Sequence, residues 1–306
     1  MRQKKVVVAG ATGSLGSKIV NELLSQGAEV TAMVRTTSNR EKLTKLGVKN
    51  FVIGDMMDME SLRKALTPEQ RFDAIVASAA GYTGHSKGDS EKTDTVGYKN
   101  LVDASKAAGI ARFVLISILE SNNAAEVPHF HNKYLIEQYL KERQQPFIAL
   151  RPGAFLDQTP DFILPKIKKG ILPVFFVGVN YGTIYTLDLA RYAAVAAVTV
   201  PDSELNTSVD VGLSTSVNSE SLAKAFSKVL NTPIAAKPVV PSFVLKVVAP
   251  IVSIFSSKMR DMNEMVKWVN TGVYVSRNTS KQKELFGDLP TIEEAVSRYA
   301  KDNNLI

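Results

Sequence analysis

Short apolar runs alternate with amphipathic stretches along the first half of the chain. The runs are rich in valine, isoleucine, leucine and phenylalanine, which is typical of buried strands. We predict strands over residues 6–9, 30–34, 50–54, 72–77, 112–116 and 147–150. The stretches between them predict helices over residues 17–24, 59–66, 95–108 and 128–143. This alternation predicts an α/β fold with a parallel, doubly wound sheet.

The pattern loosens after Arg151-Pro152-Gly153, which we expect to end the sixth strand. Prolines, aromatic residues and shorter apolar runs follow. We predict a late strand over residues 209–213 and helices over residues 187–198, 219–230, 253–269 and 291–301. The last helix carries a capping box, because Glu294 follows Thr291 at the required spacing. We expect residues 1–153 to form a core and residues 154–306 a region interwoven with it, as one integrated domain.

The first strand runs into a glycine-rich turn and a helix, in the sequence VVVAGATGSLGSKIV. Glycine permits the tight turn, lets the backbone approach a pyrophosphate, and lets the helix pack close to its strand. The helix N-terminus then offers free N–H groups to the phosphates. This order of elements predicts a dinucleotide site, with contacts from Gly10, Thr12, Gly13, Ser14, Leu15 and Gly16.

The second predicted strand ends on Arg35, where an acidic residue would select NAD by binding the ribose hydroxyls. An arginine can instead bind a 2′-phosphate. Thr36, Ser38 and Arg40 add donors in the same loop. We therefore predict NADP(H) as the cofactor, so residues 1–153 would be the NADP(H)-binding core. The alternative is that Arg35 is a solvated loop residue.

Further cofactor contacts are expected where other strands end. Asp55 follows the third strand and either accepts from the adenine amino group or caps the next helix. The remaining expected contacts are Met56, Ala77, Ser78, Ala79, Lys133, Pro152 and Gly153. Residues 82–95 are polar, and we expect them to form a mobile loop over the site, with Tyr82 on the substrate side.

Composition excludes several classes of function. The chain has no cysteine and three histidines without a clustered ligand pattern, so neither disulfides nor a structural zinc site is expected. The net charge of +7 comes from scattered lysines and arginines, which does not predict nucleic-acid binding. The apolar stretch 243–255 contains Lys246 and Pro250 and is too short to span a bilayer. We expect a cytoplasmic protein that is a monomer or homodimer.

The chain resembles the atypical short-chain dehydrogenase/reductases of the NmrA-like branch. The resemblance rests on GATGSLG at residues 10–16, Arg35, GDMMDMESLRKAL at 54–66, and GYKNLVDASKAAGIARFVLIS at 97–117. RPGAF at 151–155 and TLDLAR at 186–191 extend it. It covers roughly the first two thirds of the chain, and it implies a Rossmann fold, NADP(H) binding and a small C-terminal substrate region.

The resemblance also implies catalytic residues, and here the sequence departs from the family. Carbonyl-reducing members use a serine after strand five and a Tyr-x-x-x-Lys motif. Ser117 and Lys133 match the serine and the lysine, but His129 stands in place of the tyrosine. An imidazole beside Lys133 would have a lowered pKa and serve better as a base than as an acid. Glu137 lies one turn beyond Lys133, and we expect the two to form an ion pair.

These features favour an NADPH-dependent oxidoreductase that transfers hydride to a small hydrophobic carbonyl, enone or quinone. The missing tyrosine favours quinones, because they need less help from a placed acid. His129, Phe155 and Phe162 are expected to contact this small-molecule substrate, whereas most other aromatic residues after Gly153 belong to the core. The alternatives are a non-catalytic redox sensor that regulates a partner and, less favoured, an epimerase or dehydratase of nucleotide-linked sugars.

Overall fold

The computed structural model describes the whole chain except residues 1, 82–91, 159 and 240–255. Internal contacts divide the chain into two compact units. The first unit contains residues 1–122, 128–151 and 186–209, and the second contains residues 123–127, 152–185 and 210–306. The chain therefore returns to the first unit after beginning the second.

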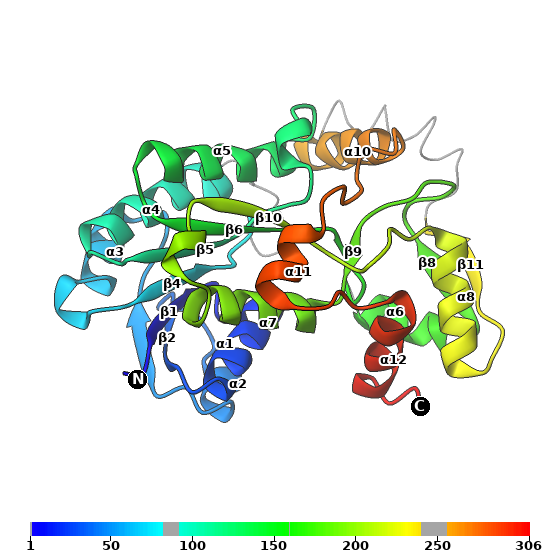
Figure 1. The fold of residues 1–306 in the computed structure, drawn as a ribbon, viewed down its shortest axis with the longest axis horizontal. Helices are drawn as coiled ribbons and strands as arrows, with labels where there is room; N and C mark the ends of the chain where they lie inside the picture. The colour runs from blue at the N-terminus through cyan, green and yellow to red at the C-terminus, as the bar shows by residue number, and fades with distance from the viewer. Residues whose placement is uncertain (1, 82–91, 159, 240–255) are drawn as a thin grey trace. The chain divides into compact units, whose positions relative to one another are not determined.

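A seven-stranded sheet holds the first unit together (Figure 1), in the order β10-β6-β5-β4-β1-β2-β3. Its strands are β1 Lys5–Ala9, β2 Glu29–Val34, β3 Asn50–Ile53, β4 Ala74–Ala77, β5 Arg112–Ile116, β6 Phe147–Pro152 and β10 Thr207–Val211. The pairings from β3 through to β6 are parallel. The strand order reverses between β1 and β4, so the carboxyl ends of these two strands form the crevice where such folds bind ligands. The predicted doubly wound sheet is confirmed.

Helices cover both faces of this sheet. Helices α3, α4 and α5 lie on one face and α1 and α7 on the other (Figure 1). The helices of the first unit are α1 Ser14–Ser25, α2 Glu41–Lys45, α3 Met59–Ala65, α4 Tyr98–Ala107, α5 Pro128–Glu142 and α7 Thr186–Val198, with a π-helical turn at Lys92–Gly97 before α4. Because the sheet is covered twice, strands such as β1 read as continuous apolar runs without alternation.

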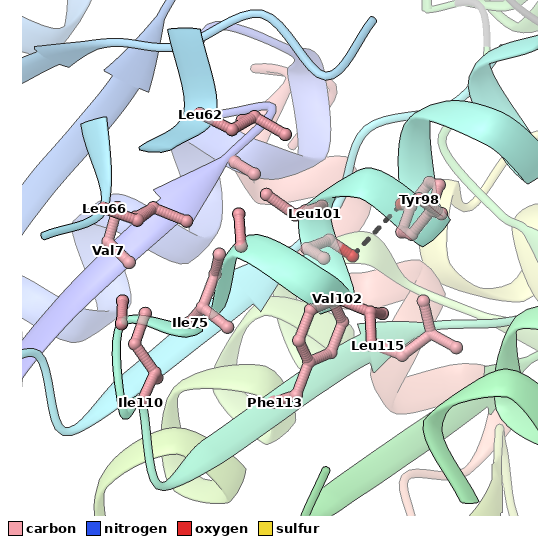
Figure 2. Close-up of a cluster of buried hydrophobic side chains, with 14 of the residues drawn as sticks. Val7, Leu62, Leu66, Ile75, Tyr98, Leu101, Val102, Ile110, Phe113 and Leu115 are labelled. Atoms are coloured by element: carbon pink, nitrogen blue, oxygen red, sulfur yellow. Dashed lines mark hydrogen bonds between the residues drawn. The ribbon is translucent and has the colours of Figure 1, made fainter. Parts of the chain in front are cut away.

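The core between the sheet and helices α3 to α5 is built from alternate strand positions. Val7, Ile75 and Phe113 come from three neighbouring strands, point to the same face, and are fully buried (Figure 2). Leu62 and Leu101 meet them from the helices. Burying such side chains stabilises the fold by about 1.5–3 kcal/mol each. This packing fixes the positions of the strand ends that carry the site.

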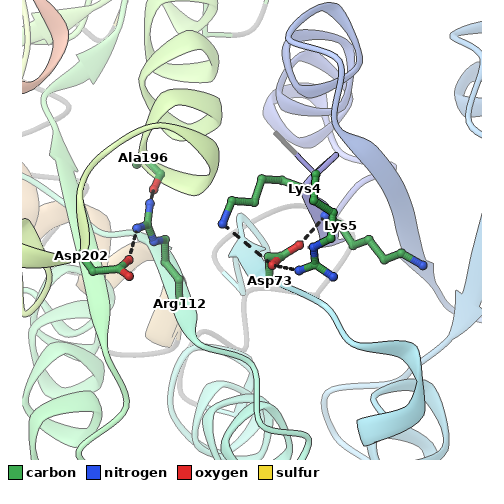
Figure 3. A network of polar contacts seen from close by, with 7 residues as sticks. Lys4, Lys5, Asp73, Arg112, Ala196 and Asp202 are labelled. Carbon is green, nitrogen blue, oxygen red and sulfur yellow. Dashed lines mark hydrogen bonds and ion pairs between the residues drawn. The ribbon is translucent and has the colours of Figure 1, made fainter.

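Charged side chains form hydrogen bonds and ion pairs at the amino ends of these strands, opposite the carboxyl ends that carry the site. Arg112 donates to the Ala196 carbonyl at 2.8 Å and to Asp202 at 2.5 Å (Figure 3). Asp73 accepts from the Lys5 backbone N–H at 2.8 Å. Both groups lie at the amino ends of strands, so we assign these charges to the fold and not to the site.

The second unit combines short strands with helices. Two parallel two-stranded sheets pair β7 Ala154–Phe155 with β9 Thr183–Ile184 and β8 Ile171–Val174 with β11 Ala235–Pro238. Its helices are α6 Pro160–Ile167, α8 Ser219–Leu230, α10 Ser257–Val269, α11 Ser280–Phe286 and α12 Ile292–Asp302. Helices α8 and α12 pack through Phe226 and Tyr299, whose ring centres are 5.6 Å apart.

Several predicted boundaries move by a few residues. Helix α1 begins at Ser14, not at residue 17, because Gly13 already has the extended backbone of an N-cap. Strand β6 continues through Arg151 and Pro152, where the sequence predicted a break. Helix α10 begins at Ser257, and residues 253–255 of its predicted range lie outside the described residues. The capping box of Thr291 and Glu294 is confirmed.

Candidate functional site

Two glycines of the turn between β1 and α1 have no room for a side chain. Gly10 has a φ of +82°, and a Cβ there would lie 2.6 Å from the backbone nitrogen of Ala79. A Cβ on Gly16 would overlap the carbonyl of Gly10. Gly13 is the N-cap of α1 and brings no capping side chain. The turn is therefore closely packed against the end of β4, and no side chain covers the N-terminus of α1.

The outer side of this turn fits a pyrophosphate. Thr12, Gly13 and Ser14 are exposed, whereas Leu15 is half-buried and Gly16 is buried. The first N–H groups of a helix lack partners within the helix and attract anions. Since no side chain caps α1, a bound phosphate would complete its first turn.

A cavity of about 540 Å³ adjoins the turn and is lined by Thr12, Asn39, Glu41, Lys42, Lys45 and Leu46. Lys42 donates to the Ser17 hydroxyl on α1 at 2.7 Å, and Lys45 pairs with Glu41 at 2.7 Å. The Lys42 ammonium on α2 thus contacts α1 beside the glycine turn, and Lys45, paired with Glu41, lines the same cavity. Sequence reasoning missed these two lysines, although they continue the run of cations that begins at Arg35.

The predicted donors of the loop after β2 lie before α2, and none of them lines this cavity. Arg35 and Thr36 are exposed, and the Arg35 backbone N–H donates to the Ser38 hydroxyl at 3.1 Å. The guanidinium of Arg40 lies over the Phe51 ring, 5.5 Å from its centre. Exposed cations in this loop are available to a solvent-facing anion.

The helix after β3 is capped by Asp58 and not by Asp55. Asp58 accepts from the backbone N–H groups of Glu60 and Ser61 at the start of α3. Asp55 instead accepts from the Met57 N–H at 2.9 Å. The capping alternative for Asp55 is therefore wrong. Its neighbour Met56 is half-buried, and its carbonyl accepts from Asn100 at 3.0 Å.

The end of β4 is held against the glycine turn. Ser78 donates to the Ala9 carbonyl from its backbone N–H at 3.0 Å and from its hydroxyl at 3.1 Å. The next carbonyl, that of Ala79, accepts from the Tyr98 hydroxyl at 2.5 Å. Figure 2 shows Tyr98 reaching this end of the core from α4. Ala77 is buried, so the strand end offers mainly backbone to a ligand.

Lys133 lies beside this strand end, in a buried ion pair. Its ammonium donates to Asp94 at 2.9 Å and to the Ala79 carbonyl at 3.2 Å, and it lies 3.9 Å from the centre of the Tyr98 ring. Burial alone would lower the pKa of Lys133, but Asp94 and Tyr98 raise it above its ordinary value. Burial raises the pKa of Tyr98, and the Lys133 charge opposes part of that rise. At neutral pH Lys133 is a fixed cation and not a base.

The predicted ion pair between Lys133 and Glu137 is wrong. Glu137 is fully buried and accepts from Arg151 at 2.5 Å, from Ser208 at 2.7 Å and from Ser117 at 2.5 Å. The spacing on α5 suggested a pair along the helix, but Glu137 faces groups on β6 and β10 that are distant in sequence. The hydroxyl proton of Ser117 is thereby committed to a buried carboxylate.

His129 begins the face of α5 that also carries Lys133, four residues later. Its side chain is buried and meets the edge of Phe130, with ring centres 4.6 Å apart. The other predicted substrate residues fall elsewhere. Phe155 is half-buried and Phe162 is 39% exposed, both in the second unit, while Tyr82 lies outside the described residues.

Pro152 and Gly153 also belong to the second unit. A Cβ on Gly153 would overlap the backbone of Gly182, so glycine is required there for strand packing. In the described part of the chain, no group of three or more His, Asp or Glu side chains is arranged to hold a metal ion. Nor is any described helix long and apolar enough to cross a membrane.

Comparison with known proteins identifies the family of this chain. A family model described as NAD(P)H-binding matches residues 10–168, just over half of the chain. A photosystem II assembly factor, Ycf39, of Guillardia theta is 32% identical over 192 residues, which are 61% of this chain and 59% of that protein. The match therefore spans about three fifths of that relative's length.

Solved structures share the fold at low identity. An NADPH-dependent quinone oxidoreductase from Escherichia coli, complexed with NADPH, has a TM-score of 0.73 at 16% identity, covering 96% of this chain and 99% of that one. A nucleoside-diphosphate-sugar epimerase from Staphylococcus aureus has a TM-score of 0.74 at 18% identity, with coverages of 96% and 100%. At such identities the likeness concerns the fold alone.

Proposed function

Because this chain belongs to the NAD(P)H-binding family, we propose that it is an NADPH-dependent oxidoreductase acting on a small hydrophobic carbonyl, enone or quinone. The observation that carries the proposal is the glycine turn, where no side chain caps α1 and which adjoins a cavity lined by Lys42 and Lys45. The turn would hold the pyrophosphate. Arg35, Thr36, Arg40, Lys42 and Lys45 would surround a 2′-phosphate. Asp55 and Met56 would lie near the adenine.

The bound cofactor would supply a hydride, and this chain's residues would orient it and handle the proton. Lys133 keeps its charge through Asp94, so we propose it as a cation near the nicotinamide end and not as a base. We propose His129 as the group that exchanges the proton, because imidazole is the commonest general acid and base in enzymes and His129 lies one turn before Lys133 on α5. Ser117 donates to Glu137, and we propose that it positions the strand end.

The central experiment measures NADPH oxidation against a panel of quinones and aldehydes. We expect turnover by the wild type and a loss of about a hundredfold or more in kcat for His129→Ala. His131→Ala is the matched control, since His131 is on the same helix and contacts Tyr134, at 5.9 Å between ring centres. The absence of turnover with every acceptor, together with tight NADPH binding, would refute the oxidoreductase.

Such a result would favour the second candidate, a non-catalytic NADP(H) binder that regulates or assists a partner. The observation behind it is the relative in Guillardia theta, which is named as an assembly factor and not as an enzyme. An epimerase has support only from the fold. It would be distinguished by conversion of a nucleotide-linked sugar without net oxidation of the cofactor.

A further inference from the structure

Asp94 is a buried carboxylate that joins two parts of the first unit. It lies in the π-helical turn Lys92–Gly97, and its side chain is 2% exposed. π-helical turns are rare and occur frequently at functional sites. One carboxylate oxygen accepts from Lys133 at 2.9 Å, and the other accepts from the Gly81 backbone N–H at 2.9 Å. A single side chain therefore links α5 to the segment that follows β4.

The same segment receives two more donors at Ala79. The Tyr98 hydroxyl and the Lys133 ammonium both donate to its carbonyl, and the ammonium also faces the Tyr98 ring. An ammonium group has three N–H donors, and here Asp94, Ala79 and the ring provide three partners. In this arrangement Lys133 holds the backbone at the end of β4 in place through its hydrogen bond to the Ala79 carbonyl.

The end of β4 in turn packs closely against the glycine turn, and no space for an added atom remains between Gly10 and Ala79. Even a single added carbon on Gly10 would lie 2.6 Å from the Ala79 nitrogen. The Ser78 N–H is bonded to the Ala9 carbonyl next to it. Since close-packed backbones transmit displacements, a shift of Ala79 or Gly81 would move the surface on which a dinucleotide lies.

We propose that Asp94 is a positioning residue for the cofactor. It holds Lys133 on the Ala79 carbonyl and fixes Gly81 directly, and so it sets the spacing between the end of β4 and the glycine turn. The proposal rests on the proposed binding of NADP(H). In this arrangement Lys133 serves together with Asp94 to hold the Ala79 carbonyl in place. The competing arrangement, in which Lys133 binds the cofactor ribose directly, makes the opposite prediction for Asp94.

The deciding variant is Asp94→Asn, which removes the charge but keeps the size of the side chain. We expect its Kd for NADPH to rise roughly tenfold, with faster amide hydrogen exchange in the peptide that contains Gly81. If Lys133 instead contacts the ribose directly, release from Asp94 frees an ammonium donor, and NADPH affinity stays constant or increases. An unchanged or lower Kd in a folded Asp94→Asn variant would overturn the proposal.

Removing the charges of both Asp94 and Lys133 distinguishes a positioning role of this pair from a purely structural one. Asp94→Asn leaves Lys133 buried without a counter-charge, which destabilises the fold. The double variant Asp94→Asn with Lys133→Met should recover much of the melting temperature, while the Kd for NADPH stays raised. Recovery of both would mean that the pair serves stability only. Asp94→Glu, which keeps the charge, should restore part of the affinity.

The matched control is Asp103→Asn on the neighbouring helix α4, where Asp103 pairs with Arg143 at 2.7 Å. We expect wild-type NADPH affinity and wild-type exchange at Gly81 from this variant. Failure of the proposed NADP(H) binding looks different: the wild type itself would then bind no NADPH, and Asp94 would have no cofactor to position. Binding by the wild type with equal binding by Asp94→Asn refutes only the role of Asp94.

Discussion

At the scale of single residues, the glycines of the first turn differ in what they tolerate. Gly16→Ala would place a carbon onto the Gly10 carbonyl, whereas the nearest atom to a Cβ on Gly13 is 3.2 Å away. We expect Gly16→Ala to destabilise the protein by about 1–3 kcal/mol and to abolish NADPH binding. Gly13→Ala should lose less stability than Gly16→Ala, because its closest contact is longer. Denaturant unfolding and cofactor titration measure both, and equal stabilities of the two variants would contradict the assignment.

Ser117 can be tested for a catalytic as against a positioning role. Removing its hydroxyl leaves the buried Glu137 carboxylate with fewer donors, which costs about 1–3 kcal/mol of stability. We therefore expect Ser117→Ala to unfold at lower denaturant concentration while kcat at saturating substrate stays near the wild-type value. Ser208→Ala removes a comparable donor and should behave alike. A large loss of kcat with unchanged stability in Ser117→Ala alone would identify Ser117 as catalytic.

At the scale of elements, the cap of α3 separates Asp58 from Asp55. Asp58 accepts two backbone N–H groups of the first turn, so Asp58→Ala should cost about 1 kcal/mol in the free energy of unfolding. Asp55→Ala leaves that cap intact and should be the milder change in stability. If Asp55 contacts adenine, the same variant should also bind NADPH more weakly. Chemical denaturation with and without NADPH measures both effects.

At this scale the sequence predicts the elements that depend on short-range patterns of residues. The strand, glycine turn and helix of residues 5–25 follow from apolar runs and glycine spacing, and the membership of an NAD(P)H-binding family that they indicate is confirmed. The partner of Lys133 could not be read in this way, because Asp94 is 39 positions away in a stretch predicted as a loop. Glu137 likewise pairs with Arg151 and Ser208, which only the packed sheet brings to it.

The same reasoning explains what the sequence did not indicate at the proposed cofactor site. Arg35 was predicted because its position at the end of a strand carries meaning by itself. Lys42 and Lys45 line the cavity because α2 turns them toward the glycine loop, and a helix of five residues leaves little periodic signal in the sequence. A count of cations from Arg35 to Lys45 would have indicated them.

At the scale of the whole molecule, the cofactor should stabilise the chain by binding only its folded form. A ligand at a hundred times its Kd adds about 2.7 kcal/mol to the free energy of unfolding. We expect NADPH to raise the melting temperature by several degrees, and NADH at the same concentration to raise it much less, because the proposed site of Arg35, Lys42 and Lys45 would favour a 2′-phosphate. Thermal melts with each cofactor measure the difference.

The selectivity itself must then depend on those cations. Arg35→Asp should reduce the shift given by NADPH, and Lys42→Ala should reduce it too, because Lys42 lines the cavity beside the glycine turn. Lys49→Ala is the matched control, since Lys49 is exposed and follows α2 without lining the cavity. Equal shifts by NADPH and NADH in the wild type would contradict a 2′-phosphate site. The glycine turn would then serve NAD(H) equally well, and the cations after β2 would belong to the solvated surface.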